Sequence, residues 1–264
     1  MRRVIVAFLL LCLSFTLVAQ GFTVPFAPRP VSSGGCTPPT MTYRWSAYAL
    51  TGTPNCGTGG GTTCTTSGQS VYSIPESVAS NTATDSGTLG TYQTNAINGL
   101  PAISINSTSG YAMTTNIPSS VTTYTLYAIF SAGNASSFSA LFGSASASNS
   151  IEYGLESSKQ FLREDNNGPT AGGTTLSTNT WYTGVMTWNT ASGAYVLYLC
   201  SAGTCSVDAS GTVVTAPSDP ITNLAGPSRD YAFLGSVAEW GYRNGIDSNP
   251  SSDIGAWSLC KFAH

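Results

Sequence analysis

Six cysteines follow the N-terminal segment of this chain, and their spacing constrains the fold more than any other feature. They are Cys36, Cys56, Cys64, Cys200, Cys205 and Cys260. An even number of cysteines in an exported chain is typical of disulfide bonding. Among the pairings that six cysteines allow, the short loops favour Cys56–Cys64 and Cys200–Cys205, which leaves Cys36–Cys260 to tie the two ends of the domain together. A zinc site is disfavoured, because the sequence has no CxxC pair and its one histidine is the last residue.

The N-terminal segment predicts export. Residues 1–3 carry two arginines, residues 4–18 are apolar, and small Ala19 follows them. This is the pattern of a secretory signal peptide over residues 1–19, and the apolar stretch is too short for a good membrane span. We therefore expect a secreted protein, extracellular or at the cell surface, with no membrane span after cleavage. A twin-arginine signal and a lipid anchor on Cys12 fit less well, since Cys12 lies inside the apolar stretch.

Composition bounds the partners and the number of domains. Charged residues make up 8% of the chain, the net charge is −3, and Lys159 and Lys261 are the only lysines. No basic patch can neutralise several phosphates, so nucleic acid is excluded as a partner. Apolar residues reach 41%, well above the range of disordered chains. We expect a Pro- and Gly-rich lead-in over residues 20–40 and a single domain over residues 41–264.

Strand signals recur along the domain, and helix signals are nearly absent. Residues 124–130 form the strongest run, apolar on both faces and therefore central in a sheet. Residues 181–188 and 195–200 read as a hairpin around the Gly-containing turn 189–193. Only residues 251–262 suit a short helix. The pattern predicts an all-β fold, a two-sheet antiparallel jelly-roll sandwich or a related sandwich stapled by disulfides.

Four stretches in order carry a family resemblance. They are NAINGLPAISINSTSGYAMTTNIPSSVTTYTLYAIF, IEYGLESSKQFLRED, TTLSTNTWYTGVMTWNTASGAYVLYLC and LGSVAEWGYRNGIDSNPSSDIGAWSLC. Together they resemble the concanavalin A-like lectin/glucanase superfamily, and within it the laminin-G-like modules of secreted bacterial proteins. The resemblance covers roughly residues 90–260 and indicates fold more than function. The N-terminal third departs from the family pattern, because residues 80–87 replace its Asp-rich Ser-Gly-Asn-Gly turn.

The same resemblance raises the question of calcium, which many modules of this family bind at the sandwich rim through an acidic side chain and backbone carbonyls. The chain offers only loop acids for this, namely Asp165, Asp208, Asp230 and Asp247. No metal ligand set is assigned from the sequence, and no other cofactor is expected.

The sequence disfavours catalysis. One terminal histidine cannot supply a Ser-His-Asp or Cys-His apparatus or a histidine-bound metal, and no phosphate-binding loop motif is present. A carboxylate pair for glycoside hydrolysis remains, with Glu152, Glu156, Glu164 and Glu239 as candidates. On one strand Glu152 and Glu156 lie about 13 Å apart, beyond the roughly 5–9.5 Å that hydrolysis uses. The closely spaced acidic triplet of the superfamily's glucanases is also missing, and its lyases use a histidine.

Period-two alternation selects candidate ligand-binding residues. In residues 181–188 one face carries Trp188 and the other carries Trp181 and Thr183. The family resemblance implies that the first face packs between the sheets and that the second faces outward, with Trp181 either in edge packing or in contact with a ligand. In residues 237–244 Glu239 and Arg243 share a face opposite Ala238, Trp240 and Tyr242, as a surface ion pair or a rim contact to a ligand. The candidate ligand-binding residues are therefore Trp181, Thr183, Glu239, Arg243 and Glu152.

The sequence as a whole favours a secreted, non-catalytic module that recognises carbohydrate or another extracellular or cell-envelope ligand, such as an extracellular protein. Two alternatives stay open. The low-charge Ser/Thr/Gly surface also suits a structural or adhesive subunit of a surface or fibre, with self-assembly. The fold also suits a polysaccharide-degrading glycoside hydrolase on the same jelly roll.

Overall fold

The computed structural model describes residues 35–48, 53–79, 81–84, 90–105, 113–115, 117, 121–133, 138–144, 151–164, 167–213, 221–225 and 233–263, with residues 163–164 and 167–170 as backbone only. The chain divides into two units, Met1–Pro30 and Val31–His264. The first unit, with the expected signal peptide, lies outside the described residues. All elements below belong to the second unit.

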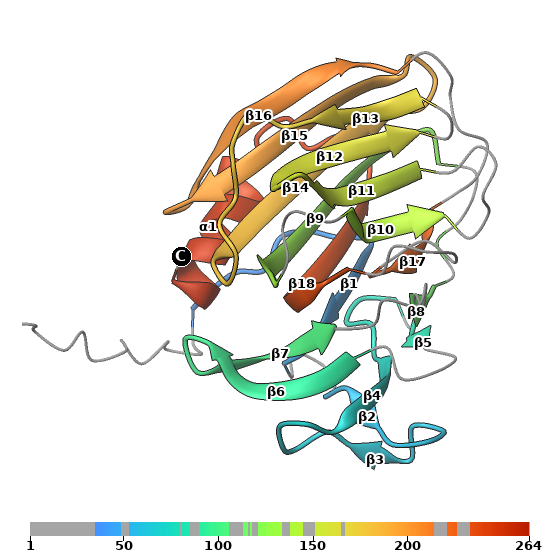
Figure 1. Ribbon diagram of the computed structural model, residues 1–264, viewed down its shortest axis with the longest axis vertical. Coiled ribbons are helices and arrows are strands. Elements are labelled where there is room, and N and C mark those ends of the chain that lie inside the picture. Colours follow the sequence, from blue (N-terminus) through green and yellow to red (C-terminus); the bar gives the residue numbers. More distant parts are fainter. Residues whose placement is uncertain are drawn as a thin grey trace, which may run out of the picture. The chain divides into compact units, whose positions relative to one another are not determined.

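Six antiparallel strands form the first layer of the fold (Figure 1). In spatial order they are β1 (Tyr43–Ser46), β18 (Gly235–Asn244), β9 (Thr123–Ala132), β14 (Trp181–Asn189), β15 (Ala194–Ser201) and β16 (Thr204–Thr212). The central strand β9 is the apolar run TYTLYAIFSA, and nine of its ten residues are buried. A strand that is apolar on both faces needs cover on both sides, which the rest of the fold provides.

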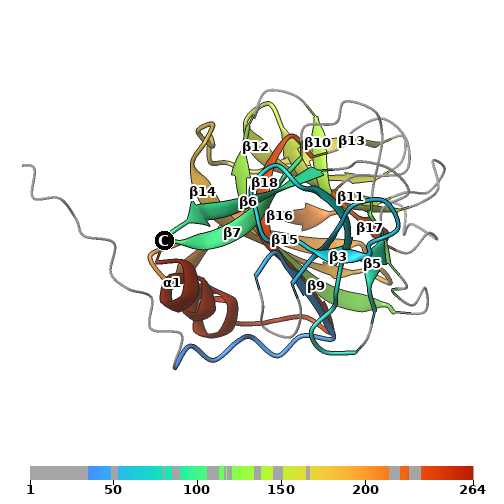
Figure 2. The ribbon, with the colours of Figure 1, turned by 90° about the horizontal axis from the view of Figure 1, so that it is seen from below.

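A second antiparallel layer consists of β17 (Ile221–Leu224), β10 (Ser139–Ser144), β11 (Ile151–Glu156), β12 (Lys159–Glu164) and β13 (Asn167–Ala171). Smaller strands connect the layers: β2 (Asn55–Cys56), β3 (Thr62–Thr63), β4 (Ser70–Ile74), β5 (Ala83–Thr84), β6 (Gly90–Ile97), β7 (Leu100–Ile105) and β8 (Met113–Thr114). The β6–β7 hairpin passes the ends of β9 and β18 (Figures 1 and 2) and pairs through β7 with the first residues of β18. The prediction of an all-β fold is confirmed.

The inner core lies between the two layers and includes Phe130, Trp188 and Trp240 of the first layer with Phe142 and Tyr153 of the second. The layers face each other closely at Gly184 on β14. A Cβ atom there would lie 2.4 Å from the Tyr153 hydroxyl and 2.7 Å from Oε1 of Gln160. The expected burial of Trp188 is confirmed, since its side chain is fully buried. A β-sandwich is therefore the architecture of the described residues.

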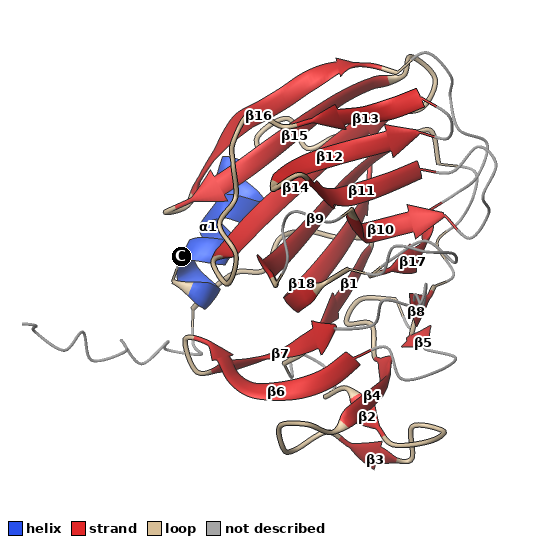
Figure 3. Ribbon diagram, viewed as in Figure 1, coloured by secondary structure: helices blue, strands red, loops and turns tan. Residues whose placement is uncertain are grey.

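A second cluster, the outer core, covers the opposite face of the first layer. It includes Tyr127, Ile129 and Val185 from the sheet, with Trp257 and Phe262 from a C-terminal helical segment. That segment begins as one π turn, η1 (Ser251–Gly255), and continues as α1 (Ala256–Phe262). It is the helical segment drawn among the strands in Figure 3. The short helix expected over residues 251–262 is confirmed, and it buries a sheet face that the sequence pattern assigns to solvent.

Three disulfides join the cysteines as their spacing predicts. Cys56–Cys64 and Cys200–Cys205 close short loops, across 8 and 5 residues of sequence. Cys36–Cys260 spans 224 residues and ties the start of the described chain to α1. Within the described ranges, no helix is long and apolar enough to cross a membrane.

Candidate functional site

Three serines form a row that crosses β7 and the outer face of the first layer, and we call them the serine row. Ser104 on β7 lies opposite Ser236 on β18, and Ser236 lies opposite Ser131 on β9. Their chain neighbours Ile103, Phe130 and Val237 point into the inner core, so the alternation of a strand turns the serines to the other face. A hollow of about 310 Å³ opens over the row, which we call the serine hollow.

Two glycines shape the serine hollow. Gly133 and Gly235 line it, and Gly235 has a φ of +152°, a conformation that favours glycine. A Cβ atom on Gly235 would lie 2.1 Å from the Ser131 carbonyl oxygen. The main chain can therefore run close beneath the hollow only because residue 235 has no side chain.

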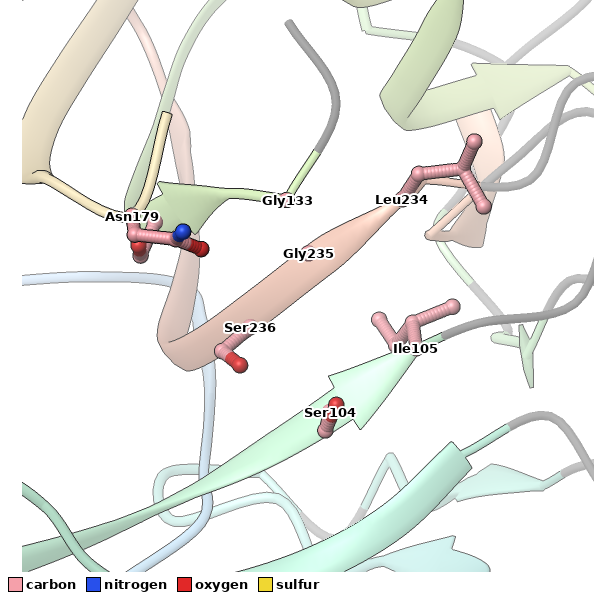
Figure 4. Close-up of a pocket in the computed structure, with 8 residues that line it drawn as sticks. Ser104, Ile105, Gly133, Asn179, Leu234, Gly235 and Ser236 are labelled. Carbon is pink, nitrogen blue, oxygen red and sulfur yellow. The ribbon is translucent and has the colours of Figure 1, made fainter. Parts of the chain in front are cut away.

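Asn179 stands at the rim, opposite Leu234 and Ile105 in Figure 4. Its backbone is left-handed, with a φ of 56°, and its N–H donates to the Ala132 carbonyl at 2.7 Å. This hydrogen bond fixes the turn before β14, while the Asn179 side chain stays exposed. The hollow thus offers an amide beside the serine hydroxyls, groups that can both donate and accept hydrogen bonds.

Trp181 continues the serine row on the next strand. It is the register partner of Ser131 across β9 and β14, and directly opposed residues hold their Cβ atoms about 5 Å apart. Its side chain is half-buried and packs against the outer core. Of the candidates that the sequence suggests, Trp181 is the one placed beside the hollow.

The described residues that line the serine hollow carry hydroxyls, an amide and apolar groups but no charged side chain. None of these described groups is a general acid, a general base or an activated nucleophile. What the arrangement can do is form neutral hydrogen bonds and apolar contacts with a bound molecule.

Glu239 lies far from solvent, and the expectation that it faces outward is wrong. The side chain is fully buried beneath the helical segment. Its Oε1 accepts hydrogen bonds from the Tyr127 hydroxyl and, at 2.9 Å, from the Trp257 indole. Burial raises the pKa of Glu239 to about 8, although Arg44, the Trp257 hydrogen bond and Lys261 each pull it down. Glu239 is thus a protonated structural group at neutral pH.

Arg243 does not pair with Glu239, so the expected ion pair is wrong as well. Its Nη1 contacts Asp253 Oδ2 at 3.1 Å and Asp247 Oδ2 at 3.5 Å. The reason lies in the cover of β18: the helical segment seals Glu239, whereas Arg243 reaches the first turn of η1. The carboxylates of Asp247 and Asp253 both contact the Arg243 guanidinium. Asp247 also accepts a hydrogen bond from the Asn249 N–H, so these contacts anchor the turn that starts the helix.

The strand alternation of β18 is interrupted by a bulge between Val237 and Glu239. The bulge places Ala238 in the outer core, on the same face as Glu239. The expectation that Ala238 shares a face with Trp240 and Tyr242 is therefore wrong, since a bulge shifts the period-two pattern by one residue.

Thr183 and Glu152 complete the set of candidates, and neither reaches the serine hollow. Thr183 is fully buried and exchanges a 2.6 Å hydrogen bond with Ser258 of α1, so its expected outward position is wrong. Glu152 lies on β11 in the second layer, 7% exposed, opposite Gly143 and Arg163 in register. Neither residue therefore shares a site with Trp181.

The loop acids considered as calcium ligands either contact other side chains or backbone groups of the protein or lie outside the described residues. Asp208 accepts hydrogen bonds from the Gln160 side chain at 3.0 Å and the Thr174 N–H at 2.8 Å. Asp247 binds Arg243, as above. Asp165 and Asp230 fall outside the described residues. Among the side chains that the structure describes, no group of three or more His, Cys, Asp or Glu is arranged to hold a metal ion.

The serine row and Asn179 could not be identified as site residues from the sequence. Ser104, Ser131 and Ser236 lie on strands far apart in the chain, and serine is common throughout it. Only the register of β7, β18 and β9 brings the three together. Asn179 carries one weak signal, its place in a polar Ser-Thr-Asn-Thr turn before a strand.

A close glycine contact on β18 yields a stability prediction. A Cβ atom at Gly241 would lie 1.9 Å from the buried Tyr127 ring, so Gly241→Ala should lower the free energy of unfolding by about 1–3 kcal/mol through overpacking. Urea denaturation measures this loss. Gly61→Ala is the matched control, because a Cβ there meets no atom within 4 Å; equal stability of the two variants would contradict the described packing.

Comparisons with known proteins place the fold. No protein-family model and no curated protein sequence matches the chain. Domain 4 of an extracellular family 43 arabinanase from Geobacillus stearothermophilus, solved with arabinotriose, is 18% identical with a TM-score of 0.50, covering 65% of this chain and 82% of that one. An arabinofuranosidase complexed with arabinofuranosyl-α-1,2-xylobiose is 14% identical with a TM-score of 0.53, covering 73% of this chain and 51% of that one.

A third likeness is to the sialidase of Trypanosoma rangeli in complex with the inhibitor DANA. It is 14% identical with a TM-score of 0.54, and the match covers 86% of this chain but 35% of the sialidase. The chain thus spans about half or less of the two larger enzymes. Together the likenesses show the fold alone: a β-sandwich that also occurs in these three carbohydrate-active proteins. They do not separate binding from catalysis.

Proposed function

We propose that the chain is an exported, non-catalytic carbohydrate-binding module. In this proposal residues 1–19 are a signal peptide, residues 20–40 a lead-in, and residues 41–264 one concanavalin A-like jelly-roll domain of the laminin-G-like type. The two antiparallel layers and their non-sequential strand order support the jelly roll. The three disulfides support folding in an oxidising, extracellular compartment.

One observation carries the binding function: a row of hydroxyls in a hollow, flanked by a tryptophan and lined by described residues that carry no charge. Small-ligand sites are concave and largely apolar, with a few convergent polar groups that fix the orientation of the ligand. Sugars present both hydroxyls and apolar ring faces, so the serine hollow beside Trp181 suits them. The sugar ligands in two of the neighbouring structures, arabinotriose and a substituted xylobiose, point to the same ligand class.

The absence of catalysis rests on the same site. Glycoside hydrolysis needs two carboxyl groups on either side of the scissile bond, and the described residues that line the serine hollow supply none. Among the described acids, Glu239 is sealed beneath the helix, and Asp247 and Asp253 are held by Arg243. A sugar bound in the hollow would therefore be held without being cleaved.

A glycan array probed with the purified protein tests the proposal. We expect retention on a subset of glycans, measured with calcium and again with a chelator. Binding in both conditions fits a site made of hydroxyls, whereas binding in calcium alone would add a metal to the site. The absence of binding to any glycan in either condition would refute the carbohydrate function, and concentration-dependent assembly seen by light scattering would then favour the structural alternative.

A further inference from the structure

The serine hollow is built on a sheet, which fixes the distances between its polar groups. Ser104, Ser236 and Ser131 occupy one register position on three neighbouring strands. Adjacent strands lie about 4.8 Å apart, so the three serine positions recur at that interval. The row therefore spans about 10 Å, and it can contact hydroxyls of neighbouring units along a sugar chain.

Trp181 supplies the apolar half of such a site. It follows Ser131 in the same register position on β14, and its half-buried ring is held from beneath by the outer core. Side chains that are already fixed by packing lose little entropy when a ligand binds. The tryptophan is thus a preformed surface for the apolar face of a sugar at the end of the serine row.

The charges of the site decide between neutral and acidic sugars. Recognition of a carboxylate favours an Arg fork, and none of the described residues that line the hollow has a cationic side chain. The arginines whose side chains the structure describes are occupied, because Arg243 binds Asp247 and Asp253, and Arg44 binds Ser77 and lies over the Trp257 ring. An acidic sugar would enter the hollow without a partner for its charge.

From these observations we propose that the serine hollow binds a short stretch of a neutral glycan. The serine row and Asn179 hydrogen-bond its hydroxyls, and Trp181 contacts the face of one of its rings. This inference rests on the proposed carbohydrate function and narrows it to a place and a ligand class.

Isothermal titration with neutral and acidic oligosaccharides tests the ligand class. The neutral panel comprises arabino-, xylo-, cello- and malto-oligosaccharides, and the acidic panel sialyllactose and oligogalacturonate. We expect binding to a neutral member with an affinity that changes less than about twofold between 50 and 500 mM NaCl, since no ion pair is screened. Binding to acidic members alone, weakening with salt, would overturn the neutral class and leave the carbohydrate function standing.

Two variants test the location. Ser236→Tyr fills the hollow and should abolish binding, and Trp181→Ala should weaken it about tenfold. The controls are Ser210→Tyr, at an exposed strand serine of the same layer, and Tyr72→Ala, at a half-buried aromatic outside the hollow. Both controls should bind within about twofold of the parent chain. Thermal unfolding verifies that all four variants are folded.

The outcomes separate the two proposals. Unchanged binding by folded Ser236→Tyr and Trp181→Ala proteins would overturn the site while the carbohydrate function holds. If the parent chain binds neither panel, both the function and the site are refuted.

Discussion

Replacing Cys36 and Cys260 together with serine should lower the free energy of unfolding by as much as about 5 kcal/mol. The bond spans 224 residues, and in the chain-entropy model a loop of that size restricts the unfolded chain most. The change also frees α1 from the segment that precedes β1, so Trp257 and Phe262 lose part of what holds them on the outer core. The total free energy of unfolding of most small domains is only about 5–15 kcal/mol. The expected loss is therefore a large part of the stability of the fold.

Chemical denaturation of the double variant measures this loss. The matched control is the Cys56→Ser/Cys64→Ser variant, whose bond spans 8 residues and whose removal should cost about 2–3 kcal/mol in the same model. A long-loop variant as stable as the short-loop variant would show that Cys36–Cys260 does not hold the fold together.

Glu239→Gln should remove a pH dependence of stability that the parent chain shows. The folded pKa is about 8, against an ordinary value of 4.5. Between these values the folded chain keeps a proton that the unfolded chain has lost, so the free energy of unfolding falls as pH rises through this window. The slope from this one group approaches about 1.4 kcal/mol per pH unit. Below the window both states are protonated, and above it both are ionised, so the slope vanishes.

Urea denaturation at intervals from pH 4 to 9, on both proteins, isolates the effect of Glu239. The difference in the free energy of unfolding between the two proteins should change with pH between 4.5 and about 8 and stay constant outside that range. Glutamine keeps the shape of the side chain without its ionisation. Arg44 and Lys261 act on Glu239 through their charges, but both keep their positive charge in this range. Parallel curves would mean that Glu239 is solvated and that the helix does not seal it.

Local features of the fold could be predicted from the sequence. Residues 124–130 predict the central strand because both of its faces are apolar, and β9 contains them. The hairpin of β14 and β15 follows from two strand patterns around a turn with glycine. The three disulfides follow from spacing alone, since two pairs are close in sequence and leave one remaining pair.

The faces of the sheet could not be predicted as reliably. The side chains of Thr183 and Glu239 point away from the inner core, as strand alternation predicts. The face that they share is nevertheless covered by η1 and α1. Strand periodicity gives the two sides of a strand but not what packs on each side. The bulge at Ala238 adds a one-residue shift with no clear signal in the sequence.

The candidate site depended most on long-range structure. Trp181 could be named from its strand position. The serine row, in contrast, arises from the pairing of β7, β9 and β18, and the hollow over it from the absence of side chains at Gly133 and Gly235. Pairing of strands that lie more than 100 residues apart has no local sequence signature. The inference of a non-catalytic module needed no such contacts, because it came from the residue types that the chain lacks.

NMR spectroscopy of a glycan incubated with the protein tests whether this sandwich binds a carbohydrate and leaves it intact. We expect broadened sugar resonances in the presence of the protein and an unchanged set of anomeric signals after prolonged incubation. New anomeric signals that grow with time would show cleavage and refute a non-catalytic module, and sugar resonances that stay sharp for every glycan retained on the array would refute binding.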